Sequence, residues 1–188
     1  DACNSKKGRR LTIVKKARSA RTVKSAVFTV FTAFTYFTVM IYIASDHAGY
    51  ALKEVLKKYL EELGDPSQDL GPGTLNPDDD YPDSASLLAR EILQHGGKGI
   101  LLCGNAVGVC IVANKFRGIR AGIGYSTYAA KTMREDDDTN VLCLPARVLT
   151  DDEAKEILRT WLTTAFSHVE RHERRIAKIA AIEQTNMK

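Results

Sequence analysis

Short apolar runs alternate with helix-patterned segments over most of the chain, and this alternation constrains the fold more than any other feature. The clearest run, residues 99–103, is apolar throughout, which is typical of a parallel strand covered on both faces. Similar short strands are expected at 41–44, 68–70, 119–123 and 140–144. The order predicts an α/β fold, in which a doubly wound parallel sheet carries helices on both faces.

Apolar residues at helical spacing mark the segments between these strands. They predict helices over about 52–63, 85–92, 104–115, 125–134, 150–162 and 168–183. Gly64 is expected to end the first helix, and Thr150 with Glu153 to form a capping box that opens the fifth. Residues 65–83 are rich in Asp, Pro and Gly, so they are expected to be mainly loop.

The positive charge of the chain is concentrated at its beginning. Nine Lys and Arg residues and one acid fall within residues 1–40, whereas the whole chain of 188 residues has a net charge of +4. The remainder is therefore acidic overall and gives no support for binding nucleic acid.

A Phe-Thr-x triplet repeats over residues 28–39, and a period of three matches neither a helix nor a strand. The run is too short and too rich in Thr for a membrane span, although a secretory signal or an anchor is an alternative. We expect residues 1–39 to be a basic, low-complexity extension that is disordered or precedes the true start at Met40. Residues 40–188 then form a single domain.

The four cysteines are candidates for chemistry or for the core. Cys3, Cys103, Cys110 and Cys143 form no CxxC pair, and no His stands at zinc-ligand spacing from them. We therefore expect reduced thiols, a cytoplasmic protein and no metal. Cys103 stands apart because it ends a predicted strand just before a predicted helix, whose positive dipole end favours a thiolate. A buried cysteine at a strand end is the alternative.

In a doubly wound sheet, a ligand binds beyond the carboxyl ends of the strands. Three such ends are expected: Ser45-Asp46-His47, Cys103-Gly104-Asn105-Ala106-Val107-Gly108, and the acidic run after Arg134. The glycines of the second segment allow close approach of a ligand, and its backbone N–H groups can hold an oxyanion. It matches neither the dinucleotide nor the Walker pattern, and a tight packing turn is the alternative.

These segments together resemble the type B ribose-5-phosphate isomerases, a family that includes the galactose-6-phosphate isomerase subunits. The resemblance covers about residues 40–183. The matching segments are Ile43-Ala44-Ser45-Asp46-His47-Ala48-Gly49, Asp80-Tyr81-Pro82-Asp83, Leu102-Cys103-Gly104, Ala113-Asn114-Lys115, Gly118-Ile119-Arg120-Ala121, Asn140-Val141-Leu142 and Arg171-His172-Glu173-Arg174-Arg175.

The resemblance implies a Rossmann-like three-layer sandwich and an enzyme of the pentose phosphate pathway. Such an enzyme interconverts ribose 5-phosphate and ribulose 5-phosphate through an enediolate, without a metal or an organic cofactor. The resemblance also implies a homodimer or homotetramer whose active sites lie at the subunit interface, with no nucleic acid or membrane partner.

The resemblance also assigns roles to individual residues. Cys103 is the base that moves a proton between C1 and C2, and Tyr81 lines the site. The loop that stabilises the enediolate contains Gly104, Ala106, Val107 and Gly108. Asp46 contacts sugar hydroxyls, and the phosphate is held by His47, Arg147, Arg171 and Arg175, some of them from the partner subunit.

Two departures from the family pattern concern ring opening. Where the family has Gly-Thr-Gly, this chain has Gly104-Asn105-Ala106, and an amide does not relay a proton as a hydroxyl does. Where the family has His-Asn, this chain has Asp136-Asp137. We hypothesise that Asp136 takes the ring-opening role beside Asp137, the alternative being a solvated helix end. Three other functions stay open: isomerisation of an allose or galactose 6-phosphate, sugar-phosphate binding without catalysis, and association with a membrane or nucleic acid through the basic tail, which only residues 1–40 support.

Overall fold

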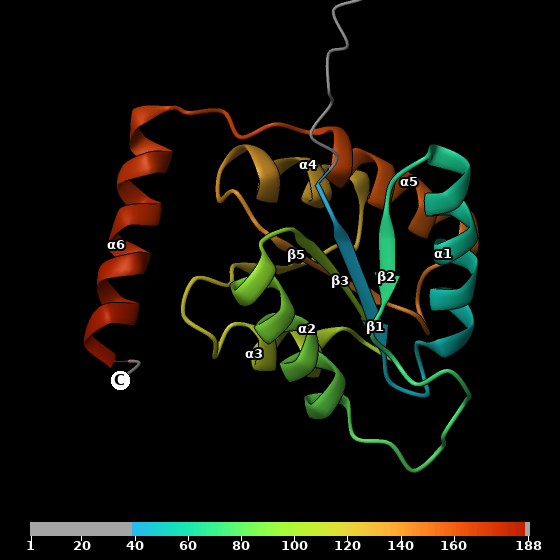
Figure 1. Ribbon diagram of the computed structural model, residues 1–188. Helices are drawn as coiled ribbons and strands as arrows, with labels where there is room; N and C mark the ends of the chain where they lie inside the picture. The colour runs from blue at the N-terminus through green and yellow to red at the C-terminus, as the bar shows by residue number, and fades with distance from the viewer. Residues whose placement is uncertain (1–38, 187–188) are drawn as a thin grey trace, which may run out of the picture. The chain divides into compact units, whose positions relative to one another are not determined.

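The computed structural model describes residues 39–186 of the chain. Within them, five strands form one parallel sheet in the order β2-β1-β3-β5-β4 (Figure 1). The strands are β1 (Ile41–Ser45), β2 (Ser67–Asp69), β3 (Lys98–Cys103), β4 (Ala121–Ile123) and β5 (Val141–Pro145). The helices are α1 (Tyr50–Leu63), α2 (Tyr81–His95), α3 (Val107–Ala113), α4 (Thr127–Glu135), α5 (Asp151–Thr163) and α6 (Glu170–Asn186).

Alternate residues of the apolar strands fill two separate cores. Ile41 and Ile43 of β1 face α1, α4 and α5, whereas Tyr42 and Ala44 face α2 and α3. Each large aliphatic side chain buried in this way contributes about 1.5–3 kcal/mol. Both faces of the sheet are covered for this reason, and the predicted three-layer, doubly wound α/β fold is confirmed.

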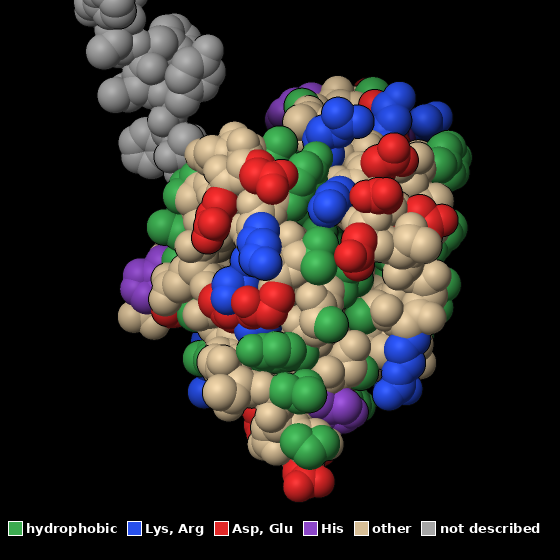
Figure 2. Space-filling view, turned by 90° about the vertical axis from the view of Figure 1, so that its right-hand side faces the viewer, with side chains coloured by type: hydrophobic (Ala, Val, Ile, Leu, Met, Phe, Trp, Pro, Cys, Tyr) green, Lys and Arg blue, Asp and Glu red, His purple; other side chains and the backbone are tan. Residues whose placement is uncertain are grey.

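The outer surface of α1 is charged, and its ion pairs join it to the neighbouring strand. Figure 2 shows Lys, Arg and acidic side chains interspersed on the face that includes this helix. Lys57 pairs with Glu54 at 3.0 Å and with Asp69 at 2.8 Å. Lys53 is fully buried, and its Nζ lies 3.0 and 2.7 Å from the two carboxylate oxygens of Asp69. This buried pair fixes α1 to β2.

Two predicted helix ends are confirmed. Gly64 follows α1 with a φ of 74°, in the left-handed region that favours glycine. At the start of α5, Thr150 Oγ1 accepts from the N–H of Glu153 at 3.3 Å. Glu153 Oε2 accepts in return from the N–H of Thr150 at 2.8 Å. This reciprocal pair is the expected capping box.

Two helices begin three or four residues from the predicted position. α2 starts at Tyr81 rather than near 85, because Pro82 suits the first turn of a helix, where its missing N–H is not needed. α3 starts at Val107 rather than 104, because residues 104–106 form a separate loop in which Ala106 has a φ of 62°. That loop becomes part of the candidate site.

The last helix, α6, stands apart from the helices that cover the sheet (Figure 1). Of its residues, His172 and Glu183 are buried. Glu183 Oε2 accepts a hydrogen bond from the N–H of Gly118 at 3.0 Å, while Ile179 and Ile182 stay exposed. Apart from residue 39, the predicted N-terminal extension lies outside the described residues. In residues 39–186, no helix has the length and apolarity needed to cross a membrane.

Candidate active site

The chain segments that follow β1 and β3 diverge at one edge of the sheet, and a cleft opens between them. The chain leaves β1 toward α1 on one face and leaves β3 toward α3 on the other, so a crevice opens between the two neighbouring strands. The cavity there has a volume of about 340 Å³. It is lined by Asp46, His47, Ala48, Tyr81, Cys103, Gly104, Asn105, Gly108, Arg147 and Val148.

Cys103 is the last residue of β3 and the nucleophilic group of this cleft. Its side chain is buried and its thiol is free. The backbone N–H of Ala106 donates a hydrogen bond to its Sγ atom at 3.1 Å. This hydrogen bond holds the sulfur at the start of the loop, where it lines the cleft.

Asn105 lies two residues after Cys103, and its side chain is oriented by the backbone of Val107. Its Oδ1 accepts a hydrogen bond from the N–H of Val107 at 3.1 Å and lies 3.9 Å from the Sγ of Cys103. Because the oxygen is engaged, the amide nitrogen is the group that can donate to a ligand. Asn105 can therefore hold an oxygen atom next to the thiol.

Two glycines of the loop allow larger side chains to approach closely. A Cβ at Gly108 would lie 2.7 Å from ring atoms of Tyr81, so the ring packs directly on this glycine. A Cβ at Gly104 would lie 3.2 Å from the side chain of Arg147. Tyr81 and Arg147 therefore pack directly against the loop that follows Cys103 (residues 104–108, the thiol loop).

Arg147 reaches the cleft because the chain after β5 continues to pair with the chain after β3. The N–H of Ala146 donates to the carbonyl of Cys103 at 2.9 Å, and the N–H of Arg147 donates to the carbonyl of Gly104 at 3.0 Å. A guanidinium is well suited to phosphate or carboxylate oxygens. The cleft therefore has a fixed cation close to its thiol.

Asp46 and His47 form the opposite wall, in the turn after β1. Asp46 Oδ1 accepts a hydrogen bond from the N–H of Gly49 at 3.0 Å and closes this turn, which leaves its second oxygen to accept from a ligand. The His47 ring is held by Asp79, whose Oδ1 lies 2.7 Å from His47 Nδ1. The sequence did not single out Asp79, because it stands between Asp78 and Asp80 in an acidic loop that is typical of solvent-exposed chain.

The acidic run after Arg134 was expected to follow a strand end, and this prediction is wrong. It follows α4 and precedes β5, and the helix returns the chain to the edge where the parallel strands begin. Asp136 and Asp137 therefore lie at the opposite edge from Cys103 within one chain. Arg171 and Arg175 at the start of α6 are near them, since His172 lies 3.4 Å from Asp136.

His172 connects the start of α6 to the acidic run. It is buried, and its Nε2 accepts a hydrogen bond from Arg171 Nε at 2.8 Å. Its Nδ1 lies 3.0 Å from the hydroxyl of Ser167 and 3.4 Å from a carboxylate oxygen of Asp136. Partial desolvation, with the neighbouring Asp136 carboxylate, raises the pKa of Asp137. Arginine and carboxylate groups are thus gathered in a second cluster.

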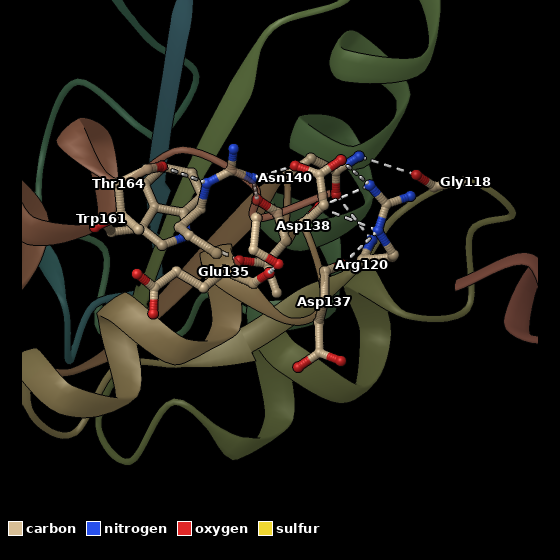
Figure 3. A network of polar contacts seen from close by, with 11 residues as sticks. Gly118, Arg120, Glu135, Asp137, Asp138, Asn140, Trp161 and Thr164 are labelled. Atoms are coloured by element: carbon tan, nitrogen blue, oxygen red, sulfur yellow. Dashed lines mark hydrogen bonds and ion pairs between the residues drawn. The ribbon is translucent and has the colours of Figure 1, made fainter. Parts of the chain in front are cut away.

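Figure 3 shows a network of polar contacts that fixes the backbone of the acidic run beside β4 and β5. Arg120 donates from its guanidinium to the backbone oxygens of Asp137 and Asp138, at 2.9 and 2.6 Å. Asn140 accepts from the N–H of Arg120 at 2.8 Å and donates to the carbonyl of Gly118 at 2.9 Å. The carboxylate of Asp137 points away from this network (Figure 3), which leaves it accessible to a ligand or another chain.

Comparison with known proteins identifies relatives over almost the whole described chain. The model of a family described as Ribose/Galactose Isomerase matches residues 41–179. The chain is 44% identical to a probable ribose-5-phosphate isomerase B of Mycoplasma pneumoniae, over 77% of this chain and 95% of that protein. It is 40% identical to ribose-5-phosphate isomerase B of Escherichia coli, over 77% of this chain and 96% of that protein.

A solved structure gives the same result for the fold. The ribose-5-phosphate isomerase B of Mycoplasma genitalium, crystallised with bound ribulose 5-phosphate, superposes with a TM-score of 0.74 at 41% identity. The match covers 77% of this chain and 96% of that protein. Fold, cleft and sequence therefore agree: the chain belongs to the ribose/galactose isomerase family.

Proposed function

We propose that the protein interconverts ribose 5-phosphate and ribulose 5-phosphate. The observation that carries this proposal is the buried Cys103 thiol, which accepts an N–H hydrogen bond beside Asn105 and Arg147 in a cavity of about 340 Å³. The names of the relatives and the ribulose 5-phosphate bound to one of them support the same substrate pair. We place the reaction in the cytoplasm, where a thiol stays reduced.

The reaction requires one base that works at two adjacent carbons. The Cys103 thiolate takes the proton from C2 of the open-chain aldose, and the electron pair forms a C1–C2 double bond while O1 becomes negative. The thiol then returns the proton to C1 as the O2 proton passes to O1, so C2 becomes the carbonyl carbon and no electrons are gained or lost. The side-chain amide of Asn105 stabilises the intermediate enediolate, together with those N–H groups of residues 104–108 that do not already bond Cys103 or Asn105.

The phosphate group of the substrate needs hydrogen-bond donors. His47 and Arg147 provide them from within the cleft, and Asp46 accepts from the sugar hydroxyls. Charge-assisted hydrogen bonds of this type contribute about 1.5–3 kcal/mol each. Binding at this end leaves the aldehyde end of the sugar beside Cys103.

We propose further that the active site is completed by a second copy of the chain, in a homodimer or homotetramer. Within one chain, Arg171, Arg175, Asp136 and Asp137 lie at the sheet edge opposite Cys103. A second copy can bring its own cluster to the cleft, where the arginines join His47 on the phosphate. The acidic pair then stands near the sugar ring.

Mixing two inactive variants tests both the chemistry and the shared site. Cys103→Ala and Arg171→Ala are each expected to turn over ribose 5-phosphate poorly. Random pairing in a dimer should restore about one quarter of the wild-type rate, because half of the dimers are mixed and each of these has one intact site. A mixture no more active than its components would contradict the shared site, and a wild-type protein inactive on ribose 5-phosphate would contradict the proposed reaction.

A further inference from the structure

One carboxylate oxygen outside the cleft binds His47 twice. Asp79 Oδ1 accepts a hydrogen bond from the backbone N–H of His47 at 2.9 Å and lies 2.7 Å from Nδ1 of the same ring. Only 17% of the Asp79 side chain is exposed, against 37% of the His47 side chain. Asp79 does not line the cleft, so it reaches a ligand there only through His47.

This contact determines which nitrogen of the His47 ring faces the cleft. A carboxylate oxygen at 2.7 Å requires a hydrogen on Nδ1, so Nε2 is the nitrogen left for the cleft. A phosphate on the Nε2 side can accept a hydrogen bond only from a ring that carries hydrogen on both nitrogens, and the ring then lies between two anionic groups. The histidine then donates a charge-assisted hydrogen bond to the phosphate.

We propose that Asp79 is a positioning residue that fixes the orientation of His47, so that Nε2 faces the phosphate. The proposal rests on the proposed function to the extent that His47 is taken to hold the phosphate. The backbone contact fixes the turn after β1, and the ring contact fixes the side chain. One carboxylate thus orders both parts of the same residue.

The local fold holds Asp79 in place from its own side. The N–H of Asp79 donates to the carbonyl of Asn76 at 3.3 Å, and the N–H of Asp78 donates to the Asn76 side chain at 3.2 Å. This turn leaves Asp78 exposed while it directs Asp79 inward. Asp78 is therefore a matched control, with the same charge one residue away and no contact to His47.

The experiment compares Asp79→Ala, Asp79→Asn and the control Asp78→Asn in the full-length chain, each with and without His47→Gln. The His47 ring is followed by nitrogen-15 NMR, and the affinity for inorganic phosphate is measured by titration. Asp79→Ala should weaken phosphate binding about 10- to 100-fold and raise KM by a similar factor, with kcat changed less than about threefold. Asp79→Asn keeps the acceptor oxygen without its charge, so it should lose about tenfold in phosphate affinity and keep the hydrogen bond from Nδ1.

Coupling to His47 separates positioning from a general effect on folding. In the His47→Gln background, Asp79→Ala should cause no further loss of phosphate affinity, because its effect passes through the ring. Equal losses in both backgrounds, or an unchanged His47 spectrum in Asp79→Ala, would overturn the proposal. The phosphate and NMR results stand whether or not ribose 5-phosphate is turned over, so a failure of the proposed function is seen separately.

Discussion

The backbone N–H of Ala106 points at the Sγ atom of Cys103, with a nitrogen–sulfur distance of 3.1 Å. This contact depends on the left-handed backbone of Ala106, whose φ is 62°. For a residue with a Cβ this conformation costs about 1–2 kcal/mol, which the surrounding loop must offset. The thiol loop therefore combines a stabilised sulfur with local strain.

Replacing Ala106 with Gly should relieve that strain. The gain is offset by the loss of a buried methyl, about 0.8 kcal/mol, and by the greater freedom of glycine in the unfolded chain, about 0.4–1 kcal/mol. We expect the free energy of unfolding to stay within about 1 kcal/mol of wild type in urea denaturation. Ala89→Gly is the control: it is equally buried but inside α2, and should lose about 2 kcal/mol. Equal losses would contradict the strain at Ala106.

Replacing Gly108 with Ala should displace the Tyr81 ring, because the new Cβ would lie 2.7 Å from it. Turnover of ribose 5-phosphate should fall about tenfold or more, since a small misplacement in an active site is costly. Gly73→Ala is the control, since a Cβ there meets nothing within 4 Å. Full activity of Gly108→Ala in the same assay would show that the position of the ring does not matter.

The Asp69 carboxylate should make stability depend on pH. Burial opposes its charge, but hydrogen bonds from Lys53, Lys57 and the N–H of Gly71 prevail and lower the pKa of Asp69 from its usual 3.8. A lowered pKa in the folded state stabilises the protein above the unfolded value, and this contribution is lost as the pH falls below about 3.8 toward the folded value.

The measurement is the urea midpoint of wild type and Asp69→Asn between pH 7 and pH 3. Near neutral pH the variant should be less stable by about 3 kcal/mol, because the buried Lys53 loses its nearest carboxylate and keeps only the longer pair with Glu54, at 3.4 Å. The difference should shrink as the pH falls below the usual range of the carboxyl group. Asp78→Asn serves as an exposed control, and a difference that does not change with pH would contradict the role of Asp69.

The sequence predicted the sheet well, and with it the parts of the site that lie at the ends of β1 and β3, for a simple physical reason. Strands covered on both faces are apolar throughout, so β1 and β3 stand out, and the polar residues directly after them belong to the cleft. Asp46, Cys103 and Asn105 are in this class. Their positions follow from strand ends that the apolar pattern locates to within a residue.

Other site residues depend on contacts that no local pattern contains. Asp79 lies 32 positions from His47, and its neighbours Asp78 and Asp80 are alike in sequence. Lys53 reads as a solvated lysine on a helix, yet it is fully buried because Asp69 of β2 lies opposite. Such pairs become visible only when the tertiary fold brings the two segments together.

The error at Asp136 has another origin. From the sequence alone, an acidic run looks the same whether it precedes or follows a strand. Only the direction of α4 places it at the edge opposite Cys103. A role in the reaction then requires a second copy of the chain.

Asp136 can be tested with two substrates that differ in ring closure. Ribose 5-phosphate must be opened from its furanose form, whereas erythrose 4-phosphate cannot close such a ring because its O4 is esterified. Asp136→Asn should therefore slow turnover of ribose 5-phosphate by about 10²-fold and spare the four-carbon substrate. Equal losses on both substrates would rule out ring opening, and no loss on either would show that Asp136 is a solvated surface residue.

The central claim is that Cys103 moves the proton in an aldose–ketose isomerisation. The most direct measurement is the turnover of ribose 5-phosphate to ribulose 5-phosphate by the wild-type chain, by Cys103→Ala, and by Cys110→Ala as a thiol control on α3. We expect Cys103→Ala to lose about 10²–10⁴ in turnover while it binds inorganic phosphate normally, and Cys110→Ala to stay near wild type. A loss of less than about tenfold in Cys103→Ala would contradict the assignment of this thiol as the base.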